Sequence, residues 1–74
     1  MRTRRLLIRP PEHTPLWVQL YVRPVGTLWA AMILPEGATP PKPGHVKGAV
    51  FFGGTAEEAE WRAISFFGDD VALN

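Results

Sequence analysis

The chain has 74 residues, of which 46% are hydrophobic and 20% charged, with a formal net charge of +1. This balance indicates one small globular domain, residues 1–74, and excludes a disordered chain. The sequence contains no cysteine, which excludes both a disulfide framework and a thiolate metal site. The apolar run near the N-terminus, Leu6 to Ile8, is too short for a signal-peptide core, and no segment resembles a membrane span. We therefore expect a cytoplasmic protein that does not contact a membrane.

The charges are unevenly distributed along the chain. Residues 1–23 hold five arginines and one glutamate, a net charge of +4, whereas residues 24–74 hold three basic and six acidic side chains, a net charge of −3. Such asymmetry can steer an anionic partner to one end of the molecule. It can equally pair two copies head to tail.

Two strands are expected before the first hairpin loop. The alternation from Arg5 to Arg9 predicts a short strand that turns Leu6 and Ile8 to one side, and the prolines that follow end it because proline cannot donate to a ladder. The next strand, Leu16 to Arg23, alternates most clearly. Its aliphatic face holds Leu16, Val18, Leu20 and Val22, and its aromatic face holds Trp17, Gln19, Tyr21 and Arg23.

Pro24-Val25-Gly26 is typical of a three-residue hairpin loop with Gly26 in the left-handed position. This loop would pair Arg23 with Thr27 and Tyr21 with Trp29. The third strand, Thr27 to Leu34, would then add Leu28, Ala30, Met32 and Leu34 to the aliphatic face, and Trp29, Ala31 and Ile33 to the aromatic face.

The segment from Pro35 to Gly48 contains four prolines and three glycines, which predicts a long loop. A last short strand, Ala49 to Phe52, should lead through Gly53-Gly54 into the helix, where a tight turn explains the two glycines better than an anion site. The tail from Asp69 to Asn74 either packs Val71 and Leu73 on the core or frays.

The only strong helix signal covers residues 56–67. Thr55 is a favourable N-cap, and Glu58 completes a capping box with it. Gly68 is suited to close the helix. The apolar face collects Ala56, Ala59, Ala63, Phe66 and Phe67. Trp61 lies near the polar side and is expected to be half covered by a loop, and Glu60 is placed to meet an arginine of the first strand.

These elements predict an α+β fold: a small antiparallel sheet of three to four strands, with one C-terminal helix packed on its aliphatic face. We expect the helix to cover the aliphatic side chains of residues 16–32. The opposite face would then leave Trp17, Tyr21, Trp29 and Ile33 exposed, a cluster typical of an interface. The alternative is that the loop at residues 35–48 folds back over these side chains within one chain.

The residue pattern offers little for catalysis. His13 and His45 lie in predicted loops without further ligands nearby, so we expect no metal site. Ser65 has no neighbouring base, and the acidic residues are explained by the helix N-terminus and the tail. We therefore expect neither an enzyme nor a cofactor.

Two binding functions remain. The first is a small interaction protein, a homodimer through the aromatic face that binds another protein. The second is a single-stranded nucleic-acid-binding protein that stacks bases on the same face. Its phosphate-binding candidates are Arg2, Arg4, Arg5, Arg9 and Arg23. The near-zero net charge favours the first function.

The order hairpin, loop, strand and helix, with Gly54-Thr55-Ala56-Glu57-Glu58-Ala59 opening the helix, resembles the small α/β domain of HicB-type antitoxins. The resemblance covers residues 27–67. It implies a domain that binds a partner protein. Because no DNA-binding segment follows the helix, it further implies a domain that does not read DNA by itself.

Overall fold

The computed structural model describes residues 2–67 and 71–73. Its elements are β1 (Arg2–Ile8), β2 (Leu16–Val25), β3 (Leu28–Pro35), β4 (Ala49–Gly53), α1 (Ala56–Phe67) and β5 (Val71–Leu73). The strands form one five-stranded sheet in the order β4-β3-β2-β1-β5, and all neighbours are antiparallel. The predicted α+β class and the bounds of the helix are confirmed. The short strand β5 adds to the predicted sheet, and β1 starts three residues earlier than Arg5, the predicted start.

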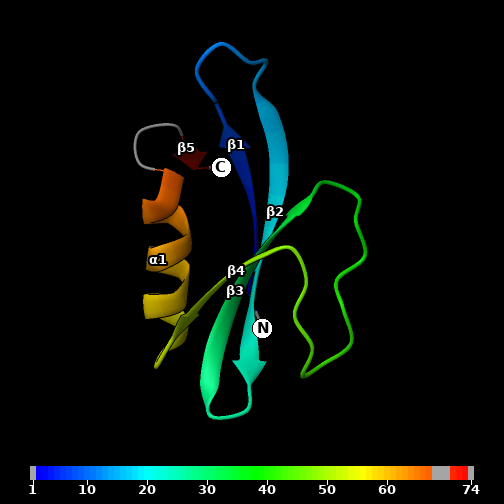
Figure 1. The fold of residues 1–74 in the computed structure, drawn as a ribbon, viewed down its shortest axis with the longest axis vertical. Coiled ribbons are helices and arrows are strands. Elements are labelled where there is room, and N and C mark those ends of the chain that lie inside the picture. The colour runs from blue at the N-terminus through cyan, green and yellow to red at the C-terminus, as the bar shows by residue number, and fades with distance from the viewer. Residues whose placement is uncertain (1, 68–70, 74) are drawn as a thin grey trace.

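The sheet separates the helix from the proline-rich connection (Figure 1). α1 lies against one face and contacts β4, β3 and β2. The connection between β3 and β4, residues 36–48, lies on the other side. Two contacts hold it there: Arg5 Nε donates to Glu36 Oε2 at 2.6 Å, and Arg23 Nη1 donates to the Pro41 carbonyl at 2.7 Å. The loop thus folds back over the sheet within one chain, which is the alternative that the sequence left open.

A two-residue loop, Gly26-Thr27, joins β2 to β3 in place of the predicted three-residue loop. Pro24 pairs with Trp29 and Arg23 with Ala30, so the predicted register is wrong. Gly26 has a φ of 61°, as predicted, but it occupies the first central position of the turn, where type II′ geometry favours glycine. Pro24 is tolerated because β1 pairs with β2 only as far as Val22 in the described chain, so its missing N–H breaks no ladder bond.

This correction moves each β3 side chain to the opposite face, because Arg23 meets a residue three positions further along than predicted and an odd shift inverts the faces. The helix face now holds Trp29, Ala31 and Ile33, together with Val18, Leu20 and Val22 of β2. The opposite face holds Ala30, Met32 and Leu34, together with Trp17, Gln19, Tyr21 and Arg23.

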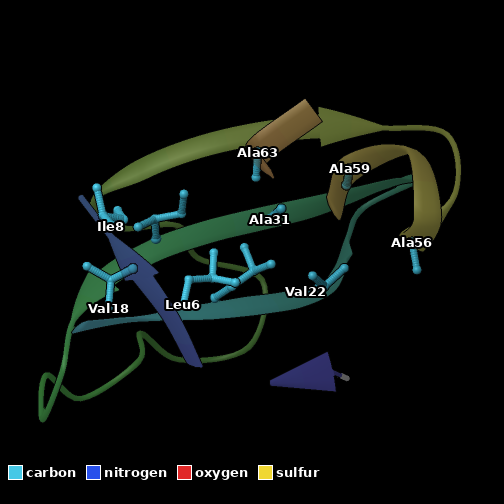
Figure 2. Close-up of a cluster of buried hydrophobic side chains, with 10 residues drawn as sticks. Leu6, Ile8, Val18, Val22, Ala31, Ala56, Ala59 and Ala63 are labelled. Carbon is cyan, nitrogen blue, oxygen red and sulfur yellow. The ribbon is translucent and has the colours of Figure 1, made fainter. Parts of the chain in front are cut away.

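The main core lies between α1 and the sheet (Figure 2). Its buried members are Leu6, Ile8, Val18, Leu20, Val22, Ala31, Ile33, Ala56, Ala59 and Ala63. The helix presents only alanines at its buried positions, which lets its backbone lie close to the strands. Leu16 and Leu28, predicted under the helix, are 45% and 46% exposed, and Ala30 and Met32 are buried on the other face.

The start of the helix follows the predicted capping chemistry. Thr55 Oγ1 accepts from the Glu58 N–H at 3.1 Å, and the Glu58 carboxylate accepts from the Gly54 N–H at 3.0 Å. The first bond satisfies a backbone donor that the first turn would otherwise leave free, and the second ties Gly54, the residue before the N-cap, to the helix. Gly53 is required here because a Cβ atom at this position would lie 2.6 Å from the Ala59 nitrogen. The predicted closing residue, Gly68, and the side chains of β5 lie outside the described residues.

Candidate interaction surface

The outer edge of β4 carries backbone groups that no strand of the described chain pairs, because β4 ends the sheet. Their direction follows from the hairpin. A two-residue loop makes Val25 and Leu28 a hydrogen-bonded pair, and such pairs alternate along antiparallel strands. Ala31 of β3 therefore bonds to Phe51 of β4. Consequently the N–H and C=O groups of Val50 and Phe52 point away from the sheet.

One of these outward groups is already occupied. Arg62 of α1 donates from Nη1 to the Phe52 carbonyl at 3.1 Å, and its Nη2 lies 3.6 Å from Glu58 Oε1. The arginine covers one end of the strand, as charged side chains commonly do at sheet edges. Its side chain is more than half exposed, so it can move aside at little cost. The strand itself contains no charged residue and no proline.

Exposed phenylalanines flank this edge on both faces of the sheet. On the helix face, the Phe66 ring lies 5.3 Å from the Phe51 ring and 5.2 Å from the Phe67 ring, measured between centroids. Phe66 is 68% exposed although the sequence placed it on the apolar face of the helix, and Phe52, on the opposite face, is 41% exposed. We call Val50, Phe51, Phe52 and Phe66 the β4 edge surface.

The four predicted interface residues do not form one cluster. Trp29 and Ile33 face the helix and pack against or within its core, whereas Trp17 and Tyr21 lie on the opposite face, where both are partly buried. The wrong register joined the two pairs. Trp17 also lies beneath Arg5, whose guanidinium carbon is 4.1 Å from the ring centroid. The β4 edge surface was missed although residues 49–52 are visibly apolar in the sequence. Only the strand order shows that this strand lies at the edge of the sheet, beside Phe66.

Most of the predicted phosphate-binding arginines are engaged within the chain. Arg2 binds Glu57 at 2.6 Å and Glu60 at 3.0 Å, and Arg4 also binds Glu60. Glu60 was expected to meet an arginine of the first strand, and both arginines belong to β1. Arg5 binds Glu36, Arg23 is buried, and Arg9 is exposed after β1. The five arginines are therefore divided between two faces of the sheet and a loop.

The ion pair between Arg2 and Glu57 affects both ionisation equilibria. The pKa of Glu57 is lowered, first by its own backbone N–H in the first turn of α1 and then by the hydrogen bond from Arg2. The pKa of Arg2 is raised by its hydrogen bonds to Glu57 and Glu60. Both groups are charged at neutral pH, so they tie β1 to the start of the helix.

Among residues 2–67 and 71–73, no group of three or more histidine, cysteine or acidic side chains converges as metal ligands would. A hollow of about 460 Å³ lies at the start of α1, bordered by Arg2, Trp29 and Thr55. The Arg2 guanidinium there is held by glutamates, and the Thr55 hydroxyl caps the helix. Both of these side chains are therefore already engaged within the chain.

Comparison with known proteins identifies no relatives: no family model, no curated protein and no solved structure matches the chain. Within the described residues, no helix combines the length and the apolar character needed to cross a membrane.

Proposed function

We propose that this protein is a small non-catalytic interaction protein that acts through the β4 edge surface. Its first partner is a second copy of itself, and the pair binds another protein. The observation that carries the proposal is the uncharged outer edge of β4 with a strongly exposed phenylalanine, Phe66, beside it. Edges of this kind join other strands unless charges or prolines block them.

The edge of β4 is self-complementary. A two-fold axis beside Phe51 would pair Val50 of one copy with Phe52 of the other, and the same pair would recur by symmetry. Each pair exchanges two N–H to C=O bonds, using the outward groups of these residues. Because Phe51 and Phe66 lie on the helix face, their rings would meet the equivalent rings of the second copy.

Side-chain burial supplies the driving force for this pairing. Covering one phenylalanine is worth about 1.5–3 kcal/mol. On each face of the paired strands, each copy contributes one exposed phenylalanine: Phe66 on the helix face and Phe52 on the opposite face. Displacing Arg62 from the Phe52 carbonyl costs little, because the Val50 N–H of the second copy would donate to that carbonyl instead. β4 itself carries no charge that would repel the same strand of a second copy.

The resemblance to HicB-type antitoxins is consistent with this role. The most specific function that it supports is that of an antitoxin-like domain that binds a partner protein. The cytoplasmic location expected from the sequence belongs to the same proposal. Single-stranded nucleic-acid binding receives less support, because four of its five candidate arginines contact groups within the chain.

Light scattering behind a sizing column tests the proposal on four proteins. The unmodified chain should be a dimer at micromolar concentration. Val50→Pro removes an outward N–H that β3 does not use, so it should give a folded monomer. Phe66→Ser should also shift the equilibrium toward monomer.

Trp61→Ser is the matched control, since Trp61 is 67% exposed on the same helix but lies away from the edge. It should leave the dimer intact. A monomeric unmodified chain, or equal weakening by Phe66→Ser and Trp61→Ser, would contradict pairing through β4.

A further inference from the structure

We propose that a pocket at Arg23 binds a carboxylate carried on an apolar group. The pocket has a volume of about 350 Å³ and is lined by Arg23, Pro24, Pro41 and Pro43. It is formed by β2 and the 36–48 connection on the face of the sheet opposite α1. Arg23 holds the connection there by a hydrogen bond to the Pro41 carbonyl. The site is therefore separate from the β4 edge surface, and the two proposals stand independently.

Arg23 is buried in an unusual way. Arg23 is only 7% exposed, whereas arginines are rarely buried without a charged partner. Nη1 donates to the Pro41 carbonyl at 2.7 Å. Nε is buried and has no acceptor among the described residues. The guanidinium thus retains unused donor capacity at the wall of the pocket.

No carboxylate of the described chain neutralises this charge. The ion pairs there join Arg2, Arg4, Arg5 and Arg62 to glutamates, and none includes Arg23. A buried charge without a counter-charge is costly, and an anion that enters the pocket would remove much of that cost. The free energy gained in this way favours binding.

The donor geometry selects the anion. With Nη1 committed to Pro41 and Nε enclosed by the protein, Nη2 is the donor left for the pocket, and a carboxylate oxygen can accept from it in a charge-assisted hydrogen bond. A phosphate group would bring more charge and more acceptors than one guanidinium can satisfy. The three proline rings form an apolar wall, which suits a hydrocarbon group attached to the carboxylate.

The size of the pocket limits the ligand. Ligand pockets run from about 300 to 1,000 Å³, so this one accepts a small acid or a single terminal residue. A free apolar acid and the C-terminal residue of a peptide share this chemistry. Hexanoate serves as the probe for the first source, and acetyl-Ala-Pro-Leu with a free C-terminus for the second. Hexanamide and the peptide amide are the neutral controls.

The direct readout is the Arg23 Nε–Hε resonance in nitrogen-15 NMR spectra of the whole chain. We expect a saturable shift with hexanoate, the peptide acid or both, and the responding probe identifies the source. The neutral amides should not shift it, because a carboxamide carries no charge to neutralise Arg23. Absence of a shift with both acids, or equal shifts with the amides, would overturn the proposal.

Two variants complete the test. Arg23→Gln should weaken acid binding by about tenfold or more, the effect of losing a charged hydrogen-bond partner, whereas Arg9→Gln, at an exposed arginine, should not. If Arg23→Gln does not fold, Pro43→Ala decides, since it removes part of the apolar wall and leaves Arg23 in place. Acid binding unaffected by the variant that folds would contradict a site at this pocket.

Discussion

Pro24 lies opposite Trp29 in the ladder between β2 and β3, and this pair determines which side chains meet the helix. It places the two-residue turn at Gly26-Thr27 and turns Trp29, Ala31 and Ile33 toward α1. The core, the β4 edge and the Arg23 pocket all depend on this register. The turn that sets this register begins with Gly26, which has a φ of 61°.

Gly26→Val should destabilise the protein by about 1–3 kcal/mol, the usual cost of holding a residue with a side chain in such a conformation. No described residue lies within 4 Å of a Cβ atom built at Gly26, so the cost comes from the backbone. Chemical denaturation measures it. Thr27→Val is the control because Thr27 does not have a positive φ. Equal stability of Gly26→Val and the unmodified chain would contradict the turn.

The adjacent glycines before α1 should respond differently to the same substitution. A Cβ atom at Gly53 would lie 2.6 Å from the Ala59 nitrogen and 2.9 Å from Glu58 Cβ, whereas one at Gly54 would meet nothing within 4 Å in the described part of the chain. Gly53→Ala should therefore cost about 1–3 kcal/mol through overpacking. Gly54→Ala should change the free energy of unfolding little. Similar unfolding midpoints for the two variants would show that the helix does not approach β4 this closely.

The stabilisation of the Glu57 carboxylate, first by its own backbone N–H and then by the ion pair with Arg2, predicts a pH dependence. The pKa of Glu57 is lower in the folded chain than its unperturbed value of about 4.3. Its contribution to stability is therefore fully present above that value and is lost as the pH falls through the folded pKa. Glu57→Gln should lower stability at pH 7 and leave it nearly unchanged at the lowest pH, as acid denaturation curves can show. Glu12→Gln, in an exposed turn, is the control, and a loss at pH 7 no larger than at low pH would count against the pair.

The sequence predicted the bounds of the helix and its N-terminal capping, but it predicted the sheet only in part. Capping at Thr55 and Glu58 is local chemistry, and the structure confirms it. The faces of β3 could not be predicted by alternation, because the five residues from Ala30 to Leu34 are all buried. The helix covers one face of this strand and the 36–48 connection lies over the other. An uninterrupted apolar run is typical of a strand covered on both sides, and that signal was available in the sequence.

The candidate surfaces were harder to predict than the fold. The β4 edge exists because, among the strands that the structure describes, β4 pairs only with β3, and strand order is not a local property of the sequence. The burial of Arg23 depends on where the 36–48 connection returns, which its prolines do not specify. Helix periodicity did predict that Glu60 meets an arginine of the first strand, but Arg2 and Arg4, which bind it, precede the predicted strand start at Arg5.

Amide hydrogen exchange at β4, followed by NMR at increasing protein concentration, tests the proposed pairing most directly. The N–H groups of Val50 and Phe52 point outward, so they should exchange rapidly in dilute solution and slow markedly as dimers form. The N–H of Phe51 bonds to β3 and should be protected throughout, which provides an internal control. Exchange rates at Val50 and Phe52 that do not change with concentration would contradict pairing through the β4 edge.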